Sequence, residues 1–345
     1  MKKNLIVSIL VLCLCMGTLV GCANSGEPQS IGNNAAGTDG EQAAGRESLS
    51  IVCTVFPQYD WVREILGDRE KASGNAELTL LLDNGVDLHS YQPTAEDIAR
   101  IATCDLFIYV GGESDGWVAD ALAEATNKDM KVINMMEVLG DGIKEEEVVE
   151  GMEAEEEEGE EGEEAEAEYD EHVWLSLKNA EVICKAISGA LSEIDTENKA
   201  LYEKNLAAYT GKLEALDEDY QKAVDGAART TLLFGDRFPF RYLVDNYGLD
   251  YYAAFVGCSA ETEASFETIV FLAGKTDELS LPAVCVLESS DQSIAKTIIN
   301  NTKNKGQKIL VMDSMQSVTS EDVAKGATYL SIMEENLEVL KEALN

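Results

Sequence analysis

Short apolar runs rich in β-branched and aromatic residues alternate along this chain with segments of helical periodicity. Such runs are typical of buried strands, and their alternation with amphipathic helices predicts parallel α/β sheets. The helical segments include residues 59–66, 95–103 and 265–273. The expected strands fall into two groups of four, at residues 49–56, 78–82, 106–110 and 132–135 and at residues 232–234, 251–255, 284–287 and 309–312.

The longest helical pattern, at residues 197–224, lies between the two groups of strands. It contains no proline and a single glycine, Gly211, and Asp195 and Thr196 offer capping side chains at its start. A helix of this length would measure roughly 40 Å at 1.5 Å per residue. We therefore expect an α/β fold with two lobes, each built on a parallel sheet, joined by one long rigid helix.

The first 48 residues have a different composition from the rest of the chain. A short basic start precedes the apolar stretch 5–20, which has the length of a secretory signal and is too short for a convincing membrane span. The stretch ends in Leu19-Val20-Gly21-Cys22, which resembles the bacterial lipobox, a signal whose cysteine is acylated and becomes the mature N-terminus. An ordinary cleaved signal is the alternative. We expect Cys22 to carry lipid and hold the protein outside the cytoplasm on the cell membrane.

The residues after Cys22 are rich in Gly, Ser, Asn and Ala, a composition that predicts a flexible tether because it cannot bury enough apolar surface to fold. The predicted organisation is a signal peptide at 1–21, a lipidated tether at 22–48, an N-terminal lobe at 49–194, a linking helix at 195–226 and a C-terminal lobe at 227–345.

The formal net charge is −39, and residues 145–168 within the first lobe hold fifteen glutamates and no basic residue. A like-charge run of this density predicts disorder. We interpret it either as a solvated low-complexity insertion or as a loose collector of cations. The acidic balance also argues against nucleic acid as a partner, because its phosphates are bound by Lys and Arg.

The chain contains two histidines, His89 and His172, and both lie in polar segments next to acidic residues. His89 follows the strand expected at 78–82. Loops at the carboxyl ends of parallel strands are where α/β proteins place ligands, and neutral imidazole is the commonest ligand for zinc-like ions. A single histidine would more often be structural, whereas two in such loops favour a metal site.

Five cysteines remain after the predicted signal and Cys22 are set aside, and their spacing fits no CxxC motif. Most lie in apolar runs, where a buried free thiol is the usual explanation. Cys258 is the exception, because it lies in a polar segment between Gly257 and Ser259.

Several segments resemble the metal-binding proteins of zinc and manganese ABC importers, in register over about residues 50–345. They are VFPQYDWVREILGD (55–68), GVDLHSYQPT (85–94), DLFIYVG (105–111), DEHVWLS (170–176), MDSM (312–315) and ATYLSIMEENL (327–337). In this family two α/β lobes joined by one long helix hold the metal in the cleft between them. By that resemblance His89 and His172 are ligands from the first lobe, and Asp313 is a ligand from the second.

The third ligand position departs from the family pattern. The family has His there, or Glu in manganese binders, whereas the resemblance puts Arg237 at this position, and a cation cannot bind a metal. Asp236, its neighbour, is our predicted substitute, although it could instead form an ion pair with an adjacent arginine. Cys258, Glu261 and Glu263, in the loop after the next strand, are the open alternatives.

The resemblance implies the extracytoplasmic solute-binding component of an ABC importer, a monomer that captures Zn²⁺ and delivers it to a permease and its ATPase without catalysis. Two imidazoles with carboxylates suit four-coordinate zinc and also manganese. The inserted loop before the second ligand favours the zinc branch, with manganese or iron as the alternative. One rival is a metallohydrolase with Glu171 as base, although no HExxH motif is present. The other is an adhesion or cation-buffering surface lipoprotein whose glutamate tract is the functional part.

Overall fold

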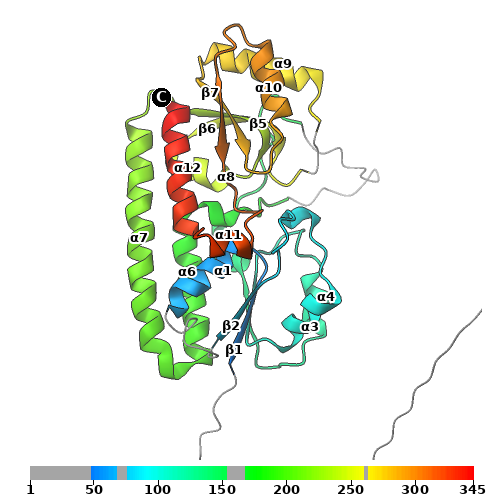
Figure 1. Cartoon of the computed structure of the whole chain (residues 1–345), viewed down its shortest axis with the longest axis vertical. Helices are drawn as coiled ribbons and strands as arrows, with labels where there is room; N and C mark the ends of the chain where they lie inside the picture. Colours follow the sequence, from blue (N-terminus) through cyan, green and yellow to red (C-terminus); the bar gives the residue numbers. More distant parts are fainter. Residues whose placement is uncertain (1–47, 68–75, 154–167, 260–262) are drawn as a thin grey trace, which may run out of the picture. The chain divides into compact units, whose positions relative to one another are not determined.

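The apolar runs of the sequence form two parallel sheets of four strands each (Figure 1). This computed structural model describes residues 48–67, 76–153, 168–259 and 263–345. The predicted signal peptide, the lipid-bearing Cys22 and the tether up to residue 47 lie outside the described residues. Glu261 and residues 154–167 of the glutamate tract lie outside them as well.

The first sheet has the strand order β2-β1-β3-β4. Its strands are β1 (Leu49–Cys53), β2 (Ala76–Leu80), β3 (Leu106–Tyr109) and β4 (Lys131–Asn134). The order reverses direction between β1 and β3, and at such a reversal the loops after neighbouring strands diverge and leave room for a ligand. The loops that follow these strands therefore form the surface on which the site is built.

The second sheet repeats this topology in the order β6-β5-β7-β8. Its strands are β5 (Thr231–Phe238), β6 (Asp250–Val256), β7 (Ala283–Leu287) and β8 (Lys308–Met312). The β5–β6 register is interrupted between Phe234 and Arg237. An irregularity of this kind changes the direction in which the side chains at the end of the strand point.

Helices flank both sheets (Figure 1). Those of the first lobe are α1 (Phe56–Leu66), α3 (Ala95–Thr103), α4 (Val118–Ala123), α5 (Met135–Leu139) and α6 (Leu177–Ile194), with 3-10 turns η1 (Leu88–Ser90), η2 (Gly140–Gly142), η3 (Val173–Leu175) and η4 (Thr196–Asn198). Those of the second lobe are α8 (Arg241–Tyr247), α9 (Phe266–Glu278), α10 (Ser293–Asn301), α11 (Ser320–Ala324) and α12 (Tyr329–Leu344).

The strand predicted at 49–56 ends earlier, because α1 begins at Phe56. Pro57 lies in the first turn, where its missing N–H costs no hydrogen bond. The Gln58 side chain reaches back and accepts hydrogen bonds from the backbone N–H groups of Thr54 and Val55, at 2.9 and 3.3 Å. These contacts turn the chain from strand into helix.

The long helix predicted at 197–224 is α7 (Lys199–Asp225), of 27 residues. It lies beside α6 and α12 (Figure 1) and also contacts α1. Its buried face includes Tyr209, Leu213 and Tyr220. The Tyr220 hydroxyl donates to the Met333 carbonyl in α12 at 2.6 Å, which ties α7 to the last helix of the chain.

The start of the glutamate tract is ordered, contrary to our expectation of disorder throughout 145–168. Glu145 pairs with Tyr169, and Glu153 pairs with Phe255 of β6. The Glu153 N–H donates to the Ala254 carbonyl at 3.0 Å. Residues 145–153 thus run from the first lobe onto the second, where backbone pairing holds them and basic partners such as Arg241 offset part of their charge.

No helix in the described part of the chain is long and apolar enough to span a bilayer. Residues 46–345 form one compact unit that does not divide between the lobes. The lobe boundaries expected at 194/195 and 226/227 therefore stay predictions.

Candidate metal centre

His89 lies on η1, in the loop between β2 and α3. The Asp87 side chain caps this turn by accepting a hydrogen bond from the His89 N–H at 3.0 Å. The His89 Nδ1 atom lies 2.8 Å from the Ser114 hydroxyl and 3.5 Å from a carboxylate oxygen of Glu171. Ser114 and Glu171 lie on the Nδ1 side of the ring, and the Nε2 atom on the other side lies 3.9 Å from an Asp87 carboxylate oxygen.

His172 lies directly before η3 and is fully buried. One carboxylate oxygen of Asp170 accepts hydrogen bonds from the His172 backbone N–H at 2.8 Å and from its ring Nδ1 at 3.1 Å. Such a carboxylate partner fixes the tautomer and leaves the Nε2 lone pair free for a metal. The Trp174 ring packs edge-on against the imidazole, with ring centroids 5.3 Å apart.

Gly257 follows β6 directly and lies against His172 from the second lobe. A Cβ atom at this position would lie 2.9 Å from the Phe238 carbonyl oxygen and 3.1 Å from Cε1 of His172. Only glycine therefore allows the backbone of the second lobe to approach the imidazole this closely.

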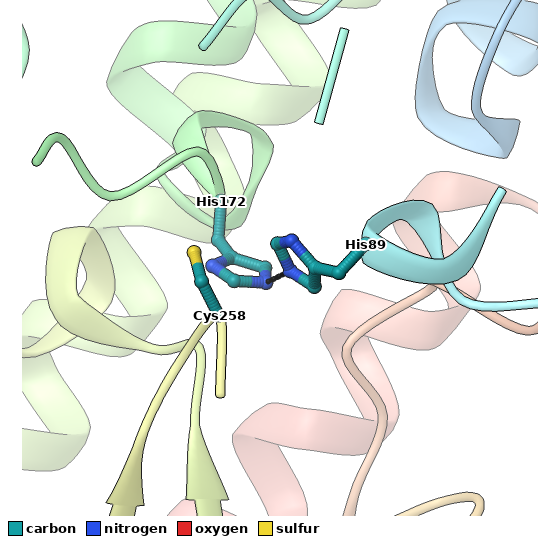
Figure 2. Close-up of side chains that lie close together, drawn as sticks. All are labelled: His89, His172 and Cys258. Carbon is teal, nitrogen blue, oxygen red and sulfur yellow. Dashed lines mark hydrogen bonds between the residues drawn. The ribbon is translucent and has the colours of Figure 1, made fainter. Parts of the chain in front are cut away.

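The two imidazole rings lie next to each other with their planes tilted by 59° (Figure 2), and their Nε2 atoms are 3.3 Å apart. A tetrahedral zinc ion holds two nitrogens at about 2.0–2.1 Å each, which separates them by roughly 3.3–3.4 Å. The fold thus holds the two Nε2 atoms at the spacing of a tetrahedral edge.

Cys258 brings a third donor from the second lobe. It lies beside His172 on the chain that leaves β6 (Figure 2). One ring nitrogen from each histidine and the Cys258 sulfur lie within 4.8 Å of one another, and in the described part of the chain these three side chains form the group with metal-ligand spacing. The Cys258 N–H donates to a Glu146 carboxylate oxygen at 3.1 Å, so the docked start of the glutamate tract contacts the site.

Acidic side chains surround the two histidines and create a negative environment that favours a cation. Burial and the neighbouring His172 lower the pKa of His89 to about 3. Burial also disfavours the charged form of His172, but the carboxylates of Asp170, Asp87 and Glu171 together outweigh it and raise the pKa of His172 above its ordinary value. The two shifts have opposite directions, so an added proton goes to His172 before His89.

The Glu171 carboxylate lies next to the Nδ1 atom of His89. Burial raises the pKa of its carboxyl group. One of its oxygens accepts a hydrogen bond from the Ser114 N–H at 2.9 Å, and the other is buried without a hydrogen-bond partner among the described residues.

Arg237, at the third position of the family pattern, forms an ion pair with Asp87. Its guanidinium lies 2.6 Å from the Asp87 carboxylate and also donates to the Ser259 carbonyl at 3.3 Å. The pair joins the second lobe to the loop that carries His89. Both residues line a cavity of about 420 Å³ between the lobes.

Asp236, the predicted substitute ligand, also lines this cavity but lies outside the group formed by the histidines and Cys258. Its two oxygens accept hydrogen bonds from the backbone N–H groups of Arg237 and Leu287, at 2.9 and 3.3 Å. Arg237 pairs with Asp87 and not with the Asp236 carboxylate. Asp236 as a ligand stays a prediction.

Asp313, the predicted ligand from the second lobe, follows β8 and accepts a hydrogen bond from the Met315 N–H at 2.7 Å. Burial and the nearby Glu288 raise the pKa of Asp313 to about 7. It too lies outside the group of ligand atoms, so its role stays a prediction. Glu263, another alternative for the third ligand, is exposed.

The sequence model of the periplasmic zinc-uptake complex component A family, ZnuA, matches residues 51–343. The chain belongs to the ZnuA family.

Among curated ZnuA-family relatives, the zinc-binding lipoprotein AdcA of Streptococcus pneumoniae (strain TIGR4) is 32% identical over 99% of this chain and 61% of its own length. The chain therefore spans less than two thirds of that protein. The high-affinity zinc uptake system protein ZnuA of Bacillus subtilis is 29% identical over 97% of both chains.

Solved structures of ZnuA-like proteins share the fold. The Zn(II)-bound ZnuA-like domain of Streptococcus pneumoniae AdcA has a TM-score of 0.66 and 29% identity, and covers 86% of this chain and 99% of that domain. The metal-dependent lipoprotein YcdH of Bacillus subtilis has a TM-score of 0.69 and 26% identity, over 86% of this chain and all of that one. The predicted architecture, two α/β lobes joined by one long helix, is confirmed.

Sequence reasoning did not anticipate the ion pair between Arg237 and Asp87 or the contact between Glu146 and Cys258. It did include Cys258 among the alternative ligands, because this cysteine lies in a polar segment of the sequence. That context separates it from Cys53, Cys104, Cys184 and Cys285, which are all buried.

Proposed function

We propose that this protein captures Zn²⁺ outside the cytoplasm and delivers it to the permease and ATPase of an ABC importer. The observation that carries the proposal is the pair of histidine Nε2 atoms, 3.3 Å apart, in a chain of the ZnuA family. Zinc is the cargo, and the protein acts by holding and releasing it.

Zinc as the cargo is supported by donor chemistry and by the relatives. Two neutral imidazoles suit zinc better than manganese, which prefers oxygen ligands. Both curated relatives described above carry zinc in their names. Manganese or iron is the alternative cargo of the same importer class.

His89 and His172 are the ligands we propose from the first lobe. Asp313 is the carboxylate we propose from the second, because its partly buried carboxyl group lies near Glu288 and a cation would relieve their repulsion. Asp236 is supported less well, since backbone N–H groups already engage both of its oxygens.

No catalytic step is part of this function. Glu171, the base that a metallohydrolase would need, faces His89 Nδ1 at 3.5 Å and the Ser114 N–H. These contacts support a role in orienting the imidazole.

The protein acts on the membrane surface as a monomer held by acylated Cys22. Support for the anchor comes from the lipobox-like sequence and from the relative named as a lipoprotein.

The test measures bound metal by mass spectrometry, with competition titration against a zinc chelator, on the chain from residue 23 onward. This fragment contains the whole unit 46–345. We expect one tightly bound zinc per chain. His89→Ala and His172→Ala should each weaken binding by about 100-fold or more, since changes even behind a ligand cost 10–100-fold. Asp129→Ala, an exposed carboxylate, is the control with unchanged affinity.

Wild-type affinity in either histidine variant would refute the ligand assignment. Tightly bound manganese in place of zinc would keep the import function and change its cargo. Many loosely bound ions that disappear when residues 154–167 are deleted would favour cation buffering instead.

A further inference from the structure

We propose that Cys258 is a zinc ligand in this protein, supplying a thiolate from the second lobe where Arg237 leaves the third position without a donor. The inference rests on the proposed function and specifies its ligand set. With Cys258 as a ligand, the metal site of this chain would include a thiolate in addition to imidazole and carboxylate groups.

Arg237 cannot contribute to a metal site. Its guanidinium remains charged and has no lone pair to donate. It is also committed to the Asp87 carboxylate at 2.6 Å and the Ser259 carbonyl at 3.3 Å. Residue 237 therefore presents no donor at the end of β5, and a ligand that takes its place has to come from another residue of the second lobe.

Cys258 follows β6, which is the strand paired with β5. Its sulfur lies within 4.8 Å of a ring nitrogen of His89 and of His172. In a tetrahedral zinc site a nitrogen and a sulfur are separated by roughly 3.6 Å, given bonds of about 2.05 and 2.3 Å. The sulfur is therefore close enough to the two rings for a small movement to bring it to a shared metal ion.

The backbone around Cys258 is held in place for this role. Gly257 lies so close to His172 that a Cβ atom there would be 3.1 Å from the ring. On the other side the Cys258 N–H is bound to Glu146 at 3.1 Å. Both contacts fix the position of the Cys258 Cα atom relative to the imidazole, which is what a ligand from a loop requires.

A purely structural role explains the other described cysteines but not this one. Cys53, Cys104, Cys184 and Cys285 are buried, as expected for thiols that act as small apolar residues. Cys258 is partly exposed, lies between two lobes and is surrounded by imidazoles and carboxylates.

Coordination forms one Zn–S bond and breaks one S–H bond, and the released proton passes to solvent. Zinc keeps its oxidation state, so no oxidant or reductant is needed. A thiolate is a soft donor that favours zinc over manganese, whereas carboxylates favour manganese. Cys258 would therefore determine which metal is selected.

Cobalt(II) is the probe that tests this proposal, because a thiolate bound to Co²⁺ gives a sulfur-to-cobalt charge-transfer absorption in the near ultraviolet. The experiment uses the reduced chain from residue 23 onward. We expect one Co²⁺ per wild-type chain, with the charge-transfer band, and loss of the band when one equivalent of Zn²⁺ displaces it.

Cys258→Ser should abolish the charge-transfer band while His89 and His172 still bind Co²⁺, and should weaken zinc binding at least about 10-fold. Cys285→Ser, a buried thiol on β7, is the matched control and should keep the band. Cys258→His should bind Co²⁺ without the band, which shows that the variant site is intact.

A wild-type chain that binds Co²⁺ through its histidines without the band would overturn the role of Cys258 and leave the proposed function standing. A band that persists in Cys258→Ser would do the same. The wild-type spectrum decides the question even if a variant fails to fold. A wild-type chain that binds neither Co²⁺ nor Zn²⁺ would overturn the proposed function as well.

Discussion

The Asp170 carboxylate orients the His172 ring and contributes to its raised pKa. Asp170 accepts hydrogen bonds from both the backbone and the ring Nδ1 of His172, at 2.8 and 3.1 Å. The Nδ1–H tautomer follows, and it leaves Nε2 available toward His89. The same carboxylate raises the pKa of His172, against the effect of burial. Asp170 therefore both orients a ligand and makes protons compete with the metal for it.

Zinc affinity is expected to fall as pH is lowered, because a metal ligand must give up its proton. The pKa of His172 lies above the ordinary value of about 6.5, so competition at this residue begins at a higher pH than for a free imidazole. His89, whose pKa is about 3, stays neutral throughout. Competition titrations between pH 8 and 5.5 measure the effect.

Asp170→Asn is the informative comparison, since the amide keeps a hydrogen-bond acceptor but removes the charge. In this variant the onset of protonation at His172 should move to lower pH, so the ratio of wild-type to variant affinity changes across the titration. A ratio that is constant with pH would contradict the assignment of the raised pKa to Asp170.

Among the elements, α7 holds the two lobes in one framework. It packs against α1 and α6 of the first lobe and α12 of the second. Leu213 is fully buried in this contact, and Tyr220 bonds to α12 at 2.6 Å. The helix is thus stabilised by tertiary packing along its buried face.

Leu213→Ala is expected to lower the free energy of unfolding by about 2–5 kcal/mol, because it leaves a cavity between tightly packed helices. Urea unfolding followed by circular dichroism measures the loss. The control is Glu214→Ala on the exposed face of α7, which should change stability by less than about 0.5 kcal/mol. Equal effects of the two substitutions would exclude the packing role of Leu213.

The glutamate tract divides into a docked part and the remaining residues. Glu146 contacts Cys258, Glu147 pairs with Arg241 at 3.3 Å, and Glu153 pairs with Phe255. Replacing residues 154–167 by a short Gly/Ser linker spares all of these contacts. We expect one-to-one zinc binding with unchanged affinity, measured by competition titration.

A deletion that extends back to residue 145 removes the contact between Glu146 and Cys258 and should weaken zinc binding. Loss of tight binding in the shorter deletion would place the metal site, or an essential part of it, within residues 154–167.

At the scale of the whole molecule, hydrogen bonds and one ion pair tie the lobes together around the site. The Trp174 indole donates to the Ser314 carbonyl at 2.9 Å. The Tyr242 hydroxyl donates to the Asp170 carbonyl at 2.8 Å, and Arg237 pairs with Asp87 at 2.6 Å. Ligands from both lobes would add to these ties, so metal binding and global stability should be linked.

Zinc at a free concentration 100 times its Kd should stabilise the folded protein by about 2.7 kcal/mol, which raises the Tm by several degrees. Differential scanning calorimetry with zinc, manganese and chelator measures the shift. His89→Ala should lose most of it at the same zinc concentration. An equal shift in wild type and variant would mean that zinc acts elsewhere on the protein.

The sequence by itself determined the strands, the helix between the lobes and the two histidine loops. The strands and α7 follow from local periodicity and from the absence of helix breakers, which do not depend on distant contacts. The two histidines were identifiable because the chain has no others and both lie in polar segments.

Only the tertiary structure decided which side chains meet. Cys258 and His172 are 86 positions apart in the sequence, and Arg237 and Asp87 are 150 apart. No periodic pattern encodes such pairings, because they depend on how the loops of two lobes face each other. The docking of residues 145–153 was missed for the same reason, since the charge run alone predicts disorder and the compensating contacts come from β6 and α8.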